Sequence, residues 1–109
     1  MPETYHVKIY QGATYKAVYA LAQPDGKAVD LNGFTVTMEM KEEGGAVITP
    51  FTTEIISPKN LGRISVSLTA QQTALLTPGR YFYTLDIESG GVVERVLEGF
   101  VLVLPGVVR

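Results

Sequence analysis

The sequence has 109 residues, of which 46% are hydrophobic and 18% are charged, and this length predicts a single globular domain over residues 1–109. Nine Lys and Arg residues against eleven Asp and Glu residues give a formal net charge of -2, so the charge predicts neither nucleic acid nor a membrane surface as a partner. Cysteine is absent, which excludes disulfides, thiolate nucleophiles and cysteine metal sites.

The first half of the chain predicts four extended segments. Residues 4–10 alternate in polarity, which is typical of a strand and not of a signal peptide or a transmembrane span. Residues 14–22 contain alanines that would tolerate a helix, but their aromatic and β-branched residues favour a strand. Residues 34–41 place four apolar side chains on one face: Phe34, Val36, Met38 and Met40. Residues 47–56 contain Pro50, which cannot donate to a neighbouring strand and so predicts a sheet edge or a bulge.

The second half predicts three more strands. Residues 63–68 and 80–88 alternate cleanly, and the second of these segments leaves Phe82 as an aromatic residue on its outer face. Residues 92–104 form the longest apolar run. Their alternation slips around Gly99, which predicts a bulge or burial on both faces.

One short helix is expected near residues 69–76. The Thr69 hydroxyl can accept a hydrogen bond at the start of this helix, and Gln72 has the spacing of a capping box. The Thr77-Pro78-Gly79 sequence ends it after two turns at most.

Turn sequences rich in Pro, Asn and Gly separate the predicted strands. Seven short strands at this spacing are typical of an antiparallel sandwich or barrel, so we expect an all-β fold with about seven to nine strands and one short helix. A two-residue turn at positions 90–91 predicts that Asp86 faces Arg95 and that Tyr81 faces Phe100.

The residue patterns predict no catalysis, cofactor or metal. The single histidine, His6, lies in a predicted strand and is interpreted as a surface residue rather than a catalytic base. The adjacent Glu42 and Glu43 are interpreted as a solvated turn rather than calcium ligands. Asp86 and Glu88 share a strand face, but a solvated face does not suit a glycosidase acid. We therefore predict that the protein is not an enzyme and has no catalytic, cofactor-binding or metal-binding residues.

A carbohydrate- or peptide-binding module is the alternative function. A sandwich can present aromatic faces to sugar rings, and the chain has six Tyr and four Phe but no Trp. The inward alternation assigns five of these rings to the core: Tyr15, Tyr19, Phe34, Tyr81 and Tyr83. Phe82 stays uncovered, and a single exposed Phe marks a protein contact or a second packing layer more often than a sugar platform.

Residues 62–87 carry a resemblance to a known family. The matching runs are GRISVSLTA at 62–70, TALL at 73–76 and PGRYFYTLDI at 78–87. They resemble the immunoglobulin-like domains of tailed-bacteriophage virion proteins, including the N-terminal domain of baseplate upper proteins. Residues 31–35 and 99–109 are similar to the same group. The resemblance implies an immunoglobulin-like β-sandwich in which Tyr81 or Tyr83 buries its ring and bonds to backbone at the corner after the helix.

The same resemblance implies a structural or assembly protein of a bacteriophage virion, in the tail, baseplate or neck or on the capsid surface. Its expected partners are other virion proteins or further copies of the chain, and its expected location is the virion, after synthesis in the host cytoplasm. Residues 100–108 are uncharged and suit a strap onto a neighbouring subunit. We predict assembly contacts through four residues: Phe82, Leu104, Val107 and Val108.

Overall fold

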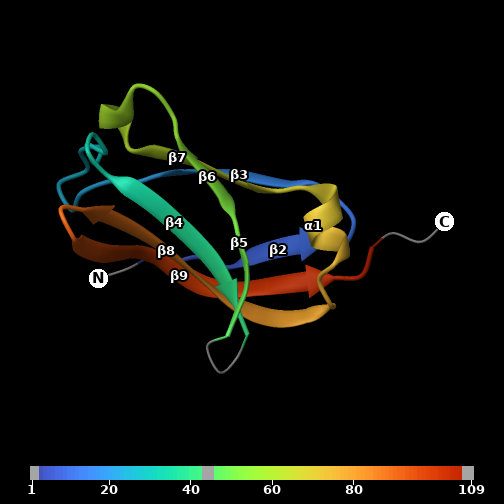
Figure 1. Ribbon diagram of the computed structural model, residues 1–109. Helices are drawn as coiled ribbons and strands as arrows, with labels where there is room; N and C mark the ends of the chain where they lie inside the picture. The colour runs from blue at the N-terminus through green and yellow to red at the C-terminus, as the bar shows by residue number, and fades with distance from the viewer. Residues whose placement is uncertain (1–2, 43–45, 107–109) are drawn as a thin grey trace.

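The computed structural model describes residues 3–42 and 46–106, which form two β-sheets around one apolar core (Figure 1). The strands are β1 (Glu3–Thr4), β2 (Val7–Tyr10), β3 (Tyr15–Ala20), β4 (Thr35–Lys41), β5 (Val47–Pro50), β6 (Thr52–Ile55), β7 (Arg63–Leu68), β8 (Gly79–Ser89) and β9 (Val92–Leu104). A 3-10 turn, η1 (Lys59–Leu61), and one helix, α1 (Ala70–Ala74), lie between them. The all-β class is confirmed. Within the described ranges, no helix has the length and apolar character needed to cross a membrane.

The strands divide unequally between the sheets. The larger sheet has the order β1-β9-β8-β4-β5, and β2 also pairs with β9. The smaller sheet has the order β3-β7-β6 and lies above the larger one in Figure 1, where α1 covers one end of the molecule. The chain passes between the sheets at Phe51, which is buried in the core. Pro50 therefore ends an edge strand, as its missing N–H predicts.

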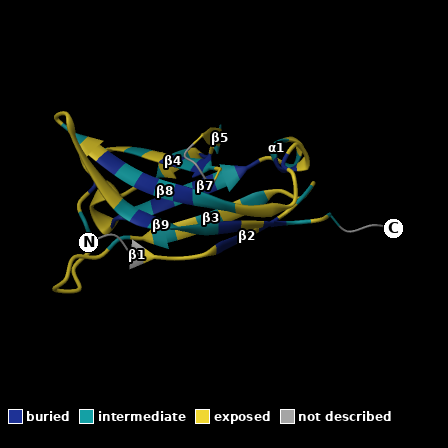
Figure 2. Ribbon diagram, turned by 90° about the horizontal axis from the view of Figure 1, so that it is seen from below, coloured by how far each residue is buried: buried dark blue, intermediate teal, exposed yellow. Residues whose placement is uncertain are grey.

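Inward-facing side chains of both sheets form the core, and exposed residues alternate with them along the strands (Figure 2). The smaller sheet contributes Ile64, Val66 and Leu68, and the larger one contributes Met38, Met40, Tyr83, Leu85, Val101 and Val103, among others. Of the five aromatic rings assigned to the core from the sequence, Tyr83 is almost fully buried, with 1% exposure. The other four are partly buried and pack against the margin of the core: Tyr15, Tyr19, Phe34 and Tyr81.

The expected helix is present, with its capping box. Gln72 N–H donates to Thr69 Oγ1 at 3.1 Å, and Thr69 N–H donates to Gln72 Oε1 at 2.8 Å. The fully buried Thr73 donates from its hydroxyl to the Ala13 carbonyl oxygen at 2.8 Å and accepts from Gly12 N–H at 3.1 Å. The helix therefore anchors the turn between β2 and β3 to the end of the core.

The β8–β9 hairpin has the predicted two-residue turn. Gly90 and Gly91 have φ values of 59° and 84°, which are the left-handed conformations that such a turn requires. Asp86 lies opposite Arg95, and Arg95 Nε contacts Asp86 Oδ1 at 3.1 Å. This part of the predicted register is confirmed.

Beyond the turn, the predicted pairing of Tyr81 with Phe100 is wrong. The ladder skips Val96, so the register shifts by one residue and Phe100 lies opposite Phe82. Val96 and Leu97 are consecutive apolar residues, and the bulge lets both pack against the core. The irregularity predicted around Gly99 is thus located three residues earlier in the chain.

The N-terminal segment corrects the expectation of a wholly antiparallel sheet. Both β1 and β2 pair in parallel with β9, and the single strand predicted there is interrupted at Tyr5 and His6. The buried Tyr83 hydroxyl donates to the Tyr5 carbonyl oxygen at 2.5 Å. A Cβ at Gly99 would collide with that same oxygen. Glycine at this position therefore allows the first strands to close the free edge of β9.

We expect Tyr83→Phe to lower the free energy of unfolding by about 1–3 kcal/mol, because the Tyr5 carbonyl oxygen loses its donor where water has little access. Tyr83→Ala also removes a buried ring and should cost about 3–5 kcal/mol. Urea denaturation measures both. The control is Leu75→Ala, at a position that is 86% exposed, which should change the free energy by less than about 0.5 kcal/mol. Equal losses for Tyr83→Phe and Leu75→Ala would contradict the assignment.

Stability should also decline at alkaline pH. Burial raises the pKa of the Tyr83 phenol above its ordinary value. The folded chain then keeps a proton that the unfolded chain loses, so the contribution of Tyr83 to the free energy of unfolding is constant below about pH 10 and is lost as the pH rises further. Tyr83→Phe should make this decline shallower without removing it, because burial also raises the pKa of Tyr15 and Tyr19. Identical declines between pH 8 and 11 would contradict this expectation.

Candidate interaction surface

The outward face of the larger sheet arranges its side chains in rows that cross the strands. One row, which we call the aromatic row, consists of His6, Phe100, Phe82 and Lys41. The basic row lies two residues to one side and consists of Lys8, Leu102 and Arg80. The acidic row lies two residues to the other side and consists of Thr4, Glu98, Thr84 and Glu39. Burial alternates along these strands, and the rows belong to the solvent-facing phase.

Phe100 is the centre of the aromatic row. The His6 ring stacks on it with a centroid distance of 4.9 Å and an interplanar angle of 13°. The Phe82 ring is tilted against it at 5.3 Å. The Arg80 guanidinium carbon lies 4.8 Å from the Phe100 ring centroid, within the range of a cation–π contact. The aromatic row and the adjoining Arg80 therefore combine apolar rings with positive charge, a composition typical of the centre of a protein interface.

His6 holds this row together through a hydrogen bond that replaces a strand contact. Phe100 N–H donates to His6 Nδ1 at 3.1 Å. The Nδ1 lone pair thus takes the place of a backbone carbonyl as the acceptor for this amide. The sequence interpretation of His6 as a surface residue is correct in position, but it missed this structural contact.

The structure brings two of the four predicted assembly contacts onto this face. Phe82 is partly covered by Phe100, and Leu104 has the same outward phase at the end of β9. Val107 and Val108 lie outside the described residues. Sequence reasoning missed Phe100, because the predicted hairpin register had no bulge between the turn and Phe100 and therefore assigned this residue to the opposite face.

Among the described residues, the structure does not assemble a site for the other chemistries considered from the sequence. Asp86 and Glu88 do share a face, but Asp86 is held by Arg95. Glu42 is exposed, and Glu43 lies outside the described residues. Within residues 3–42 and 46–106, no three His, Asp or Glu side chains gather closely enough to hold a metal ion.

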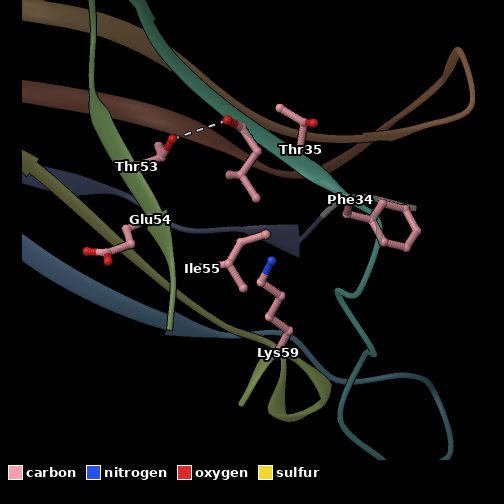
Figure 3. A pocket seen from close by; sticks show the side chains of 7 residues that line it. Phe34, Thr35, Thr53, Glu54, Ile55 and Lys59 are labelled. Carbon is pink, nitrogen blue, oxygen red and sulfur yellow. Dashed lines mark hydrogen bonds between the residues drawn. The ribbon is translucent and has the colours of Figure 1, made fainter. Parts of the chain in front are cut away.

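A cleft of about 410 Å³ lies between β4 and β6, and Figure 3 shows its lining. Its residues are Phe34, Thr35, Val36, Thr53, Glu54, Ile55 and Lys59. Thr53 Oγ1 donates to the Val36 carbonyl oxygen at 3.1 Å across the gap between the sheets. The Phe34 ring and the Glu54 carboxylate point away from each other (Figure 3). A sugar site needs an aromatic face and polar groups that converge on one ligand, so the cleft is a weaker candidate than the outer face.

Comparison with known proteins identifies a shared fold and no family. No family model matches the chain, and no curated protein matches it. InlP from Listeria monocytogenes superposes with a TM-score of 0.50 at 20% identity, over 94% of this chain and 28% of InlP. CopC from Methylosinus trichosporium OB3b gives 0.49 at 13% identity, over 94% of this chain and 89% of CopC. Tim-1 gives 0.45 at 12% identity, over 100% of this chain and 99% of Tim-1.

We expect His6→Ala to expose the Phe100 amide to exchange with solvent, because the substitution removes both its acceptor and the stacked ring. The free energy of unfolding should fall by about 1 kcal/mol, the usual value of one hydrogen bond beside water. Hydrogen exchange followed by NMR measures the first effect, and urea denaturation measures the second. Lys8→Ala, on the neighbouring exposed strand position, should leave the Phe100 amide protected. Unchanged Phe100 exchange in His6→Ala would contradict the assigned contact.

Proposed function

We propose that this chain is a non-enzymatic structural protein of a tailed-bacteriophage virion, an immunoglobulin-like β-sandwich that acts through protein–protein contacts. Its location would be the tail, baseplate, neck or capsid surface, after synthesis in the host cytoplasm. Other virion proteins or further copies of the chain would be its partners.

The fold of the segment that resembles phage immunoglobulin-like domains supports this proposal most directly. Residues 62–87 contain β7, the capped helix α1 and most of β8, in that order. Tyr81 Oη donates to the Thr77 carbonyl oxygen at 2.7 Å, which is the hydrogen bond of a tyrosine corner at the start of a strand. This hydrogen bond and the capped helix before it support the proposal.

The strand order gives further support to an immunoglobulin-like arrangement. The smaller sheet, β3-β7-β6, corresponds to the B, E and D strands of that fold, and β9-β8-β4-β5 corresponds to G, F, C and C′. The parallel pairing of the N-terminal strands with β9 extends the second sheet at its edge.

The outer face of the larger sheet supports contact with another protein. On it, the two phenylalanine rings of the aromatic row and Arg80 of the basic row form one cluster, and aromatic residues and arginine are enriched where interfaces gain most of their binding energy. The Figure 3 cleft offers no comparable convergence, so protein contact is favoured over the carbohydrate alternative.

Detection in particles tests the proposed location. An antibody raised against the recombinant chain should label tailed particles purified by density gradient from a lysate that expresses the gene, and mass spectrometry should find its peptides in the same fraction. Immunogold electron microscopy would assign the label to the capsid, neck, tail or baseplate. Presence of the chain in the lysate together with its absence from purified particles would contradict the proposal.

We expect Phe82→Asp to reduce incorporation into particles at least about tenfold, because a charge at the centre of the aromatic row opposes burial against a partner. A phage that lacks the gene, complemented with the variant chain, provides the assay. Lys16→Glu changes an exposed residue of β3 on the smaller sheet and serves as the matched control. Equal incorporation of both variants would argue against the outer face, and binding of the purified chain to oligosaccharides on a glycan array would favour the alternative function.

A further inference from the structure

The outward face of the larger sheet is divided by charge. One end carries Lys8, Lys41 and Arg80 around the aromatic rings, and the rows beyond carry Glu39, Glu98 and Glu88. Asp86 and Arg95 lie in the row between Glu98 and Glu88 and form an ion pair with each other. Among the described residues, that ion pair is the only one within 4.0 Å. Within the part of the chain that the structure describes, none of these three cations and three carboxylates forms an ion pair.

A two-fold rotation makes such a face complementary to itself. The axis lies in the plane of the face, runs across the strands and passes between the aromatic and acidic rows. Rotation about it places the aromatic row of one copy over the acidic row of the second copy, and the acidic row over the aromatic row. Lys41 of one copy then lies over Glu39 of the other, and the symmetry produces this pairing twice. By the same operation Phe82 lies over Thr84, which carries no charge, and Phe100, whose ring contacts the Arg80 guanidinium, lies over Glu98.

We propose that the chain forms a two-fold dimer through the outward face of its larger sheet, with Lys41 and Glu39 paired across the axis. This inference specifies the partner for the surface used in the proposed function and rests on it. A second copy is favoured over an unrelated partner because both charge signs are present on one face in an order that the rotation exchanges. Arg80 lines a shallow hollow together with Glu42 of the same chain. The proposed interface therefore relies on the Lys41–Glu39 pairing nearest the axis and not on Arg80.

Charge exchange between two copies provides a decisive test. Lys41→Glu should place like charges across the axis and weaken self-association at least about tenfold, and Glu39→Lys should do the same. An equimolar mixture of the two variants should associate again, because every pair across the axis in the mixed dimer joins opposite charges. The double variant Lys41→Glu with Glu39→Lys should recover self-association for the same reason. Lys16→Glu on the smaller sheet is the control and should associate like the original chain.

Sedimentation-velocity ultracentrifugation from micromolar to millimolar chain gives the association constants, and circular dichroism verifies that each variant is folded. If a single variant does not fold, the original chain still provides a test. Its amide chemical shifts should change with concentration along β4, β8 and β9, and not along β3 and β7. Added salt should weaken the association.

Three results would overturn the dimer: an original chain that stays monomeric over the whole series, shift changes confined to the smaller sheet, or a variant mixture that does not associate. Each of these leaves the proposed function open to its own test. If the original chain is monomeric and the Phe82→Asp variant fails to enter particles, the same face would contact a different virion protein. A chain that dimerises and is absent from particles would contradict the virion assignment and retain the dimer.

Discussion

The larger sheet depends on the way its first strands cross Gly99. Tyr5 lies beside this glycine and turns its carbonyl oxygen toward the interior, where the Tyr83 hydroxyl is the donor that satisfies it. A buried carbonyl without a donor would cost more than the bond contributes, so the tyrosine, the glycine and the crossing strand form one unit. The same step leaves Phe100 N–H without a backbone acceptor, and His6 takes that place on the outer side. One backbone irregularity thus connects the core to the exposed face.

The bulge at Val96 has a second consequence for that face. It absorbs one residue of β9, and the strand beyond it presents the opposite set of side chains to each side of the sheet. Phe100 therefore joins Phe82 and His6 outside, instead of facing Tyr81. The core gains two consecutive apolar residues at the bulge, and the surface gains an aromatic cluster. The packing of the core and the composition of the outer face are therefore linked through a single register shift.

Two features at opposite ends of the molecule keep the outer face in place. The helix α1 anchors the turn after β2 through the buried Thr73 hydroxyl, which bonds to two backbone groups of that turn. At the other end, the two-residue glycine turn and the Asp86–Arg95 pair hold the β8–β9 hairpin in register. The rows between them lie on hydrogen-bonded strands rather than on loops, and such surfaces lose little conformational entropy when a partner binds. This rigidity suits a structural contact better than an adaptable ligand site.

Local patterns in the sequence determined most elements but not how they meet. Alternation at 34–41 and 63–68 predicted β4 and β7, the Thr69 and Gln72 spacing predicted the capped helix, and the glycine pair at 90–91 predicted the hairpin turn, because each depends on residues close together in the chain. The parallel pairing of the first strands with β9 and the stacking of His6 on Phe100 depend on contacts between residues some ninety positions apart. The position of the bulge depends on how β8 and β9 pack against the core. Only the folded chain decides these features, since an extended segment can join either edge of a sheet in either direction. Which edge and direction it takes is set by the burial and hydrogen bonding of its partners.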